Sequence, residues 1–199
     1  MKLISFDSYE QYVEVQRQTD IHKGIHGRRR RGSPRSCASQ DELQKAADWM
    51  KARSKQINRG ICHGARHGWE VAWLREMLPG ADIVGTDLFV KEDAEVPCIQ
   101  WDFHDRDPDW VSTMDFVYSN AIDHSFDPDK AMDVWTEQLK PGGNLILLWV
   151  PPCVRARGGD CFGAHLHEYG ELIEARLVLA GVNYCGHGRY QLIGEKRDA

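Results

Sequence analysis

The sequence predicts a doubly wound α/β fold, in which a mostly parallel sheet of seven strands carries helices on both faces. From about residue 57 to residue 150, short apolar runs typical of buried strands alternate with stretches whose apolar side chains recur at helical spacing. The chain then closes with two strand-like runs, residues 182–185 and 189–194, around Gly186-His187-Gly188. This tight-turn signal predicts an antiparallel hairpin after five parallel strands.

The first strand and helix enclose a glycine turn. Residues 57–62 are short and apolar enough for a buried strand, and residues 69–78 have one apolar face before Pro79-Gly80 stops the helix. Gly64 and Gly68 mark the turn between them. Such a turn lets a ligand approach the N–H groups at a helix N-terminus. By itself it fits a ligand site and an unliganded connection equally well.

Acids stand at the predicted tips of the next strands. Further strands are predicted over residues 81–87, 96–103, 114–120 and 145–150, with helices after Asp127-Pro128 and over residues 168–180. The second strand ends in Asp87, and the third carries Asp102 near its end. An acid at the second tip can accept hydrogen bonds from both ribose hydroxyls of a nucleoside lying across the first turn.

In order and spacing, these pieces resemble the class I S-adenosylmethionine-dependent methyltransferases over about residues 57–194. The matching pieces are the glycine turn, the Asp87 tip, Trp101-Asp102-Phe103, and Ser119-Asn120-Ala121-Ile122-Asp123-His124 followed by Leu139-Lys140-Pro141-Gly142-Gly143. The resemblance implies a Rossmann-like fold with a closing hairpin. It also implies S-adenosylmethionine as cofactor and S-adenosylhomocysteine as product.

The resemblance also implies a cofactor site at the turn and the strand tips. Its expected members are His63, Gly64, Arg66, Gly68, Asp87, Leu88, Asp102, Phe103, Ser119 and Asn120. Asp102 is expected to accept a hydrogen bond from the adenine amino group, and Phe103 to stack on the adenine ring.

The glycine turn departs from the family pattern. The family usually has an acid before the glycines and a glycine between them, whereas Cys62 and Arg66 occupy those places here. A Cys-His-Gly-x-Arg-x-Gly run resembles the turn of some bacterial methyltransferases, which predicts a variant turn that still functions. Arg66 is then expected to pair with the methionine carboxylate, with two parallel hydrogen bonds if the geometry allows.

The expected catalytic residues follow the fourth strand. The reacting methyl group should lie beside Ser119 and Asn120, and Asp123 and His124 come directly after them. His124 is the predicted general base, because histidine exchanges protons near neutral pH. The alternative is that His124 only caps or packs the next helix.

Cysteines and apolar runs predict a cytoplasmic protein without a metal or a membrane span. The six cysteines are scattered and form no Cys-x-x-Cys pair, which is typical of reduced thiols. Cys153, Cys161, His165 and His167 fit no common zinc spacing, so no metal is expected. The longest apolar run, residues 145–150, is too short to cross a bilayer, and no signal peptide is predicted.

Residues 1–56 are predicted to form two helices and a basic loop that cap the methyltransferase domain, residues 57–199. The first helix should start at Asp7 as N-cap and run to about Gln18, and the second should start at Ser39. No internal repeat and no second domain is found.

Charge is unevenly distributed along the chain. Residues 21–40 contain six Lys or Arg and no acid, so the rest of the chain carries a net charge of −11. An acidic body disfavours general nucleic-acid binding. The basic stretch, residues 21–35, is either a solvated linker or a mobile flap that closes over an anionic acceptor.

Three functions remain open at this stage. The first is methyl transfer to a small molecule, such as a sugar or another biosynthetic intermediate with an anionic group. The second is a nucleic-acid or protein methyltransferase anchored by the run Arg28 to Arg31, which the acidic body disfavours. The third is an NAD-type oxidoreductase or a catalytically silent nucleotide-binding module, which the strand-tip acids and the final hairpin disfavour. The acceptor atom and the oligomeric state are left open.

Overall fold

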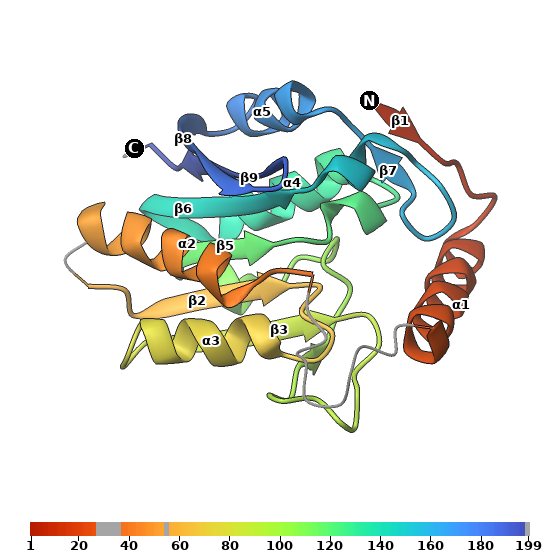
Figure 1. The fold of residues 1–199 in the computed structure, drawn as a ribbon, viewed down its shortest axis with the longest axis horizontal. Helices are drawn as coiled ribbons and strands as arrows, with labels where there is room; N and C mark the ends of the chain where they lie inside the picture. The colour runs from red at the N-terminus through yellow and green to blue at the C-terminus, as the bar shows by residue number, and fades with distance from the viewer. Residues whose placement is uncertain (27–36, 54–55, 198–199) are drawn as a thin grey trace.

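A seven-stranded sheet forms the centre of the protein (Figure 1). The structure, a computed structural model, describes residues 1–26, 37–53 and 56–197. The strands are β4 (Ile99–Gln100), β3 (Asp82–Asp87), β2 (Arg59–His63), β5 (Met114–Ser119), β6 (Leu139–Trp149), β9 (Arg189–Glu195) and β8 (Val178–Gly186), in their order across the sheet. The first five are mutually parallel, β9 runs antiparallel to β6, and β8 runs antiparallel to β9. The predicted fold class is confirmed.

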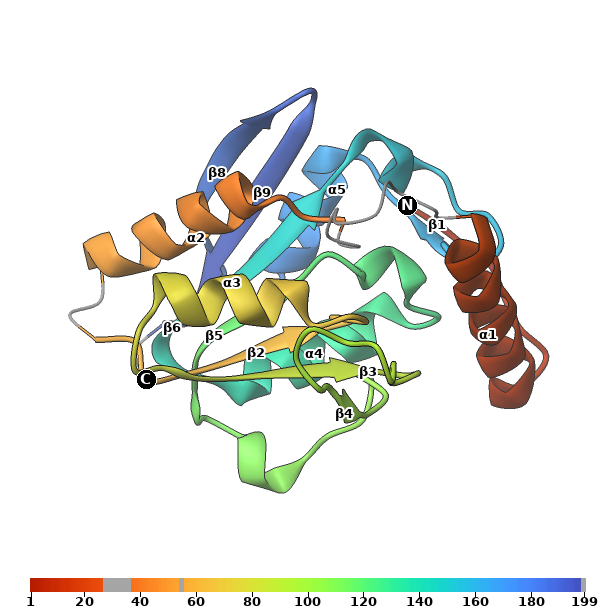
Figure 2. The ribbon, with the colours of Figure 1, turned by 60° about the horizontal axis from the view of Figure 1, so that its bottom comes forward.

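Helices cover both faces of this sheet. On one face lie α2 (Gln40–Arg53) and α3 (Trp69–Met77), and on the other lie α4 (Pro128–Gln138) and α5 (Leu166–Glu174) (Figures 1 and 2). Successive side chains of a strand point to opposite faces. Accordingly Phe116 and Tyr118 of β5 belong to the core under α2 and α3, whereas Val117 belongs to the core under α4 and α5. The two cores therefore pack against the sheet from both sides.

Two helix starts are built as predicted. At the start of α2, the Ser39 hydroxyl accepts from the Glu42 N–H at 3.3 Å, and the Glu42 carboxylate accepts from the Ser39 N–H at 2.7 Å. At the start of α4, the Asp127 carboxylate accepts from the Lys130 N–H at 3.0 Å. These caps satisfy N–H groups that have no partner within the helix.

Helix α1 (Tyr9–His26) lies beside the carboxyl ends of the strands and not on a face of the sheet (Figure 1). The predicted start and end of this helix are wrong. Ser8, not Asp7, caps it, since the Ser8 hydroxyl accepts from the Gln11 N–H at 3.2 Å. The helix also continues beyond Gln18 through residues 21–26, which were predicted as loop. Residues 27–36, the remainder of the basic stretch, lie outside the described residues.

Three element boundaries differ from the prediction because of contacts distant in sequence or a local turn. Strand β4 is short, since the Asp102 carboxylate accepts from the His104 N–H at 2.9 Å and turns the chain. Strand β6 starts early, at Leu139, because Leu139 pairs with Met114 of β5, and residues 142 and 143 hydrogen-bond to Lys196.

Helix α5 ends at Glu174 and not near Ala180. Gly181, the predicted helix stop, lies within β8 against Trp49, where a Cβ atom would come within 2.3 Å of the indole ring. Strand pairing with β9 therefore takes residues that helical spacing had assigned to α5.

A small second sheet anchors the N-terminus. Strand β1 (Lys2–Leu3) pairs antiparallel with β7 (Phe162–Gly163), which the sequence did not predict. This pairing brings the start of α1 next to the loop that follows β6. In the described ranges, no helix is long and apolar enough to span a membrane. All six cysteines lie in those ranges, and each is free.

Candidate functional site

A cavity of about 630 Å³ lies at the carboxyl ends of β2, β3, β5 and β6. Its walls come from the turn after β2, the tip of β3, the segment after β5, and the loop after β6, with α1 as the outer wall. This volume is typical of a small-molecule site, and such crevices lie at the carboxyl ends of strands in open α/β sheets.

The glycine turn is shaped by two close approaches. Gly64 has φ +71°, and a Cβ atom there would lie 2.4 Å from the Cβ atom of Ala121. Gly68, with φ +74°, precedes α3, and a Cβ atom there would lie 2.3 Å from the Val96 carbonyl oxygen. Gly64 lines the cavity, whereas Gly68 lies outside the cavity lining and packs against the backbone of Val96.

Asp87 is held at the cavity by backbone groups. Its carboxylate accepts from the Arg66 N–H at 2.9 Å and from the Phe89 N–H at 3.0 Å. Burial raises the pKa of this carboxyl group. Each oxygen retains a second lone pair, so the oriented carboxylate can still accept from a diol. Leu88 and Phe103 supply apolar walls on the same side of the cavity.

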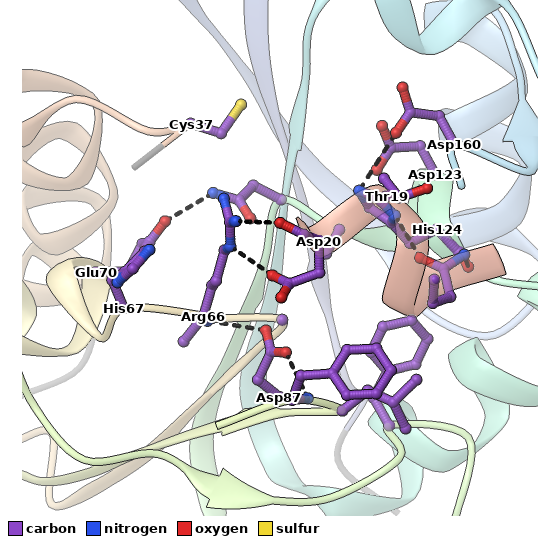
Figure 3. Close-up of a pocket in the computed structure, with 18 of the residues that line it drawn as sticks. Thr19, Asp20, Cys37, Arg66, His67, Glu70, Asp87, Asp123, His124 and Asp160 are labelled. Atoms are coloured by element: carbon purple, nitrogen blue, oxygen red, sulfur yellow. Dashed lines mark hydrogen bonds and ion pairs between the residues drawn. The ribbon is translucent and has the colours of Figure 1, made fainter. Parts of the chain in front are cut away.

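Arg66 enters the cavity and binds a carboxylate of α1. Its Nε donates to Asp20 Oδ1 at 2.9 Å, and its Nη2 donates to the Asp20 carbonyl oxygen at 3.0 Å. Lys91 also pairs with Asp20. Figure 3 shows Arg66 and Asp20 pointing toward each other and joined by hydrogen bonds. The predicted contact of Arg66 with a methionine carboxylate stays a prediction. Asp20, which Arg66 binds here, is also a carboxylate.

Glu70 is a site residue that the sequence reading missed. It lies in the first turn of α3, is 4% exposed, lines the cavity, and accepts from the Asn120 Nδ2 at 2.9 Å. Cys62, in the place of the family's acid, is instead buried in the core below α3. An acid in a first helical turn is common for electrostatic reasons, so it did not stand out as a ligand.

His63 and Ser119 do not line the cavity, although both were expected in the cofactor site. His63 is buried between Thr86 Oγ1 at 2.8 Å and Gln138 Oε1 at 2.9 Å, and burial lowers the pKa of its imidazole to about 4. The Ser119 hydroxyl donates to the His63 carbonyl oxygen at 3.1 Å. Both residues therefore join strand tips beneath the site.

Asp102 also lies outside the cavity lining. Its carboxylate accepts from the Tyr9 hydroxyl at 2.7 Å, and from the N–H and Nδ1 of His104 at 2.9 and 2.6 Å. Although burial opposes it, hydrogen bonding from His104 lowers the pKa of Asp102. The predicted adenine contact of Asp102 does not fit this arrangement, because the carboxylate is turned toward α1 and His104.

The expected catalytic residues lie at the other end of the cavity. Asp123 and His124 line it, and Asp160 from the loop after β6 joins them (Figure 3). His124 Nε2 lies 3.4 Å from Asp160 Oδ1, and its Nδ1 lies 2.9 Å from Gln16 Oε1 of α1. Neither Asp160 nor Gln16 was singled out from the sequence, because neither belongs to a strand tip.

No family model matches the chain, and no curated protein matches it either. Solved structures, in contrast, do match the chain. The chain is similar to the 1,6-didemethyltoxoflavin-N1-methyltransferase of Burkholderia thailandensis, solved with 1,6-didemethyltoxoflavin and S-adenosylhomocysteine bound. The TM-score is 0.71 at 15% identity, over 98% of this chain and 93% of that one.

Two further similar structures differ in how much of the chain they cover. One is an O-methyltransferase family protein of Burkholderia thailandensis, with TM-score 0.62 and 15% identity over 100% of this chain and 76% of that one. The other is an S-adenosylmethionine-dependent methyltransferase of Mesorhizobium loti, with TM-score 0.58 and 16% identity over 77% of this chain and 100% of that one. The fold is that of the class I S-adenosylmethionine-dependent methyltransferases.

Proposed function

We propose that the protein is an S-adenosylmethionine-dependent methyltransferase that acts on a small-molecule acceptor. The observation that carries this proposal is one cavity in which Asp87, Arg66 and Glu70 converge on the glycine turn. It lies in a sheet that ends in an antiparallel hairpin, whereas the six strands of a typical dinucleotide-binding sheet are mostly parallel. That difference argues against the NAD-type oxidoreductase.

The three polar residues match the two ends of the cofactor. Asp87 binds the ribose hydroxyls, with Leu88 and Phe103 against the adenine. Arg66 binds the methionine carboxylate, and Glu70 binds the methionine ammonium group. Support for the last assignment is that Glu70 is a nearly buried carboxylate facing the cavity, while the usual acid position holds Cys62.

The transfer is a direct displacement at the sulfonium methyl carbon. A lone pair of the acceptor forms the new bond, the carbon–sulfur bond breaks, and its electron pair returns to sulfur to give S-adenosylhomocysteine. A hydroxyl acceptor must also lose its proton, and His124 with Asp123 beside it is the predicted acceptor of that proton. Holding both reactants in one cavity lowers the barrier by removing motion that the free reactants retain.

A small acceptor fits the closure of the cavity by α1, which supplies Tyr12, Gln16 and Asp20 to its wall. The similar Burkholderia thailandensis methyltransferase was solved with 1,6-didemethyltoxoflavin bound, which supports a small-molecule acceptor here. The alternative of a nucleic-acid or protein substrate depends on Arg28 to Arg31, which lie outside the described residues. A cytoplasmic location likewise stays a prediction from the cysteines.

Isothermal titration calorimetry with S-adenosylhomocysteine tests the assignment. Asp87→Asn removes charge-assisted hydrogen bonds, so affinity should fall by about 5- to 150-fold, or about 1–3 kcal/mol. Asp82→Asn is the matched control, because Asp82 lies at the exposed opposite end of β3. Binding of NAD in place of S-adenosylhomocysteine, or unchanged affinity in Asp87→Asn, would overturn the proposal.

A further inference from the structure

Arg66 and Asp20 form an ion pair in the wall of the cavity (Figure 3). Arg66 belongs to the glycine turn after β2, whereas Asp20 lies on α1, 46 positions earlier in the chain. The Arg66 side chain is 24% exposed and the Asp20 side chain 18%. Salt and water screen such a pair less than a pair on the surface. The pairing therefore affects which charged groups the cavity can bind.

The backbone of Arg66 adopts a conformation that is unfavourable for a residue with a side chain. Its φ is +45°, in the left-handed region. The Asp87 carboxylate accepts from the Arg66 N–H at 2.9 Å and stabilises this conformation. Strained residues of this kind concentrate at functional sites, where the surrounding contacts fix their geometry. The turn and Asp87 thus hold the backbone of Arg66, and α1 supplies a partner for its side chain.

Asp20 presents to Arg66 the same chemical group as the methionine end of the cofactor. Arg66 Nε donates to the Asp20 carboxylate at 2.9 Å, and Nη2 donates to the Asp20 carbonyl oxygen at 3.0 Å. Two oxygen atoms of one residue thus occupy one edge of the planar guanidinium. Arginine commonly holds a carboxylate through two such parallel hydrogen bonds. A ligand carboxylate that uses this edge has to displace Asp20.

Exchange of the two carboxylates is favoured over their simultaneous binding. Two carboxylates beside one guanidinium repel each other, and the repulsion grows where water is partly excluded. Lys91 also pairs with Asp20. When Asp20 releases Arg66, it therefore retains a cation and does not become an unpaired charge in a partly buried site, which would be costly.

We propose that Asp20 is an internal competitor of the cofactor, with its carboxylate on the edge of Arg66 that also binds the methionine carboxylate. This inference rests on the proposed function, because it uses the assignment of Arg66 to the methionine end. The competition keeps Arg66 neutralised whenever the methionine carboxylate has left. It also reduces the apparent affinity for the cofactor in proportion to the fraction of molecules in which Arg66 is free.

The competition connects cofactor binding to α1 without requiring this helix to leave the cavity. Gln16 Nε2 donates to the Gly159 carbonyl oxygen at 2.8 Å. Thr19 also packs against Gly159, since a Cβ atom on that glycine would lie 2.3 Å from Thr19 Oγ1. Release of Arg66 by Asp20 removes one of several contacts of α1, and the others hold the outer wall in place.

Calorimetry on the full chain with S-adenosylhomocysteine and with adenosine tests the competition. Asp20→Asn keeps the size of the side chain and removes its charge. We expect it to bind S-adenosylhomocysteine at least about 5-fold more tightly than the wild type, the lower end of typical coupling between two sites. Adenosine, which has no methionine part, should bind both proteins equally. The matched control is Glu14→Gln, which removes an exposed α1 carboxylate that also pairs with an arginine, Arg17, at 3.5 Å.

A gain in affinity distinguishes competition from a structural role, because an ion pair that only positions Arg66 would weaken cofactor binding when it is lost. Unchanged or weaker binding of S-adenosylhomocysteine to Asp20→Asn, or an equal gain for adenosine, would contradict the competition. The gain must also depend on Arg66. If Asp20→Asn gives the same gain in the Arg66→Ala background, the cause is general charge repulsion, and the competition is again excluded.

The same titrations separate this inference from the proposed function. If the wild type binds S-adenosylhomocysteine and only the gain is missing, the competition fails and the proposed function stands. If neither the wild type nor Asp20→Asn binds S-adenosylhomocysteine, the proposed function fails and the competition fails with it.

Discussion

Glu70 shows how one residue changes the chemistry of a variant glycine turn. Cys62, which stands before His63 where the resembled family usually has an acid, packs in the core. A carboxylate nevertheless reaches the cavity from the first turn of α3, eight residues later. The Asn120 amide donates to it and fixes its direction. A carboxylate therefore faces the glycine turn from α3, although residue 62 is a cysteine.

Glu70→Gln should therefore weaken S-adenosylmethionine and S-adenosylhomocysteine about 10- to 150-fold, because a hydrogen bond to a charged group is lost. Adenosine, which has no methionine part, should bind as before. Calorimetry with both ligands measures the difference. Glu76→Gln, on the exposed side of the same helix, is the control. Equal losses for the two ligands would show that Glu70 acts on the fold and not on the methionine end.

His63 predicts a pH dependence of stability. Burial lowers its pKa from 6.5 to about 4, so the folded chain keeps it neutral while the unfolded chain takes up a proton below about pH 6.5. The free energy of unfolding should thus fall by about 3 kcal/mol as the pH drops from 6.5 to 4, and this contribution should level off below.

Urea denaturation at several pH values measures this effect. In His63→Gln the slope between pH 6.5 and 4 should be smaller than in the wild type, whatever the absolute stability of the variant. Replacement of the exposed His167 by Gln is the control. A variant with the wild-type slope would exclude His63 as its source.

At the scale of elements, α1 departs furthest from what local sequence predicts. Gly24 and the basic residues after it are typical of a loop, yet the helix continues to His26. The middle of the helix is tethered to the site, where Asp20 pairs with Arg66 and Lys91 and Gln16 binds Gly159. Tertiary contacts of this kind override weak local propensities.

The turn before α3 allows a sharp test of backbone geometry. Gly68→Ala places a Cβ atom against the Val96 carbonyl oxygen at positive φ, so it should destabilise by strain and by overlap together. Gly80→Ala is the matched control, because Gly80 has φ +89° with nothing within 4 Å of the added carbon. It should cost about 1 kcal/mol for φ alone.

We expect Gly68→Ala to cost about 1–3 kcal/mol more than Gly80→Ala, the usual penalty for overpacking. Chemical denaturation of both variants gives the two values. Equal costs would mean that the segment around Val96 moves aside freely, and the turn would then be less rigid than the cavity requires.

At the scale of the whole molecule, the two cores on either side of the sheet support one edge on which the cavity is built. Binding at that edge should stabilise the fold through mass action. At a ligand concentration 100 times Kd the gain is about 2.7 kcal/mol. For a chain of this length that corresponds to about 5–11 °C in Tm.

Differential scanning fluorimetry with S-adenosylhomocysteine should show this increase, and NAD should show none. In Asp87→Asn, the same increase in Tm should require a higher concentration of S-adenosylhomocysteine. The Tm of the ligand-free protein should change by much less than the increase that the ligand causes. An equal increase with NAD would favour the oxidoreductase alternative.

The sequence by itself determined the parallel units, the closing hairpin, and the glycine turn with Asp87 and Asn120 at the strand tips. These features depend on signals between near neighbours: alternating apolar runs, helix caps and glycine spacing. The apolar stripe of α2 around Leu43 and Met50 is such a signal, and both residues are fully buried. Parallel strands then bring their tips to one edge by geometry alone.

Only the tertiary structure decided which side chains face the cavity. Asp102 and Ser119 have the right positions along the chain, but Tyr9, His104 and the carbonyl group of His63 take up their hydrogen bonds. Asp160 enters through the loop after β6, which is held by Gln16 from the other end of the chain. A side chain's direction depends on partners that fold beside it, and no local pattern in the sequence encodes those partners.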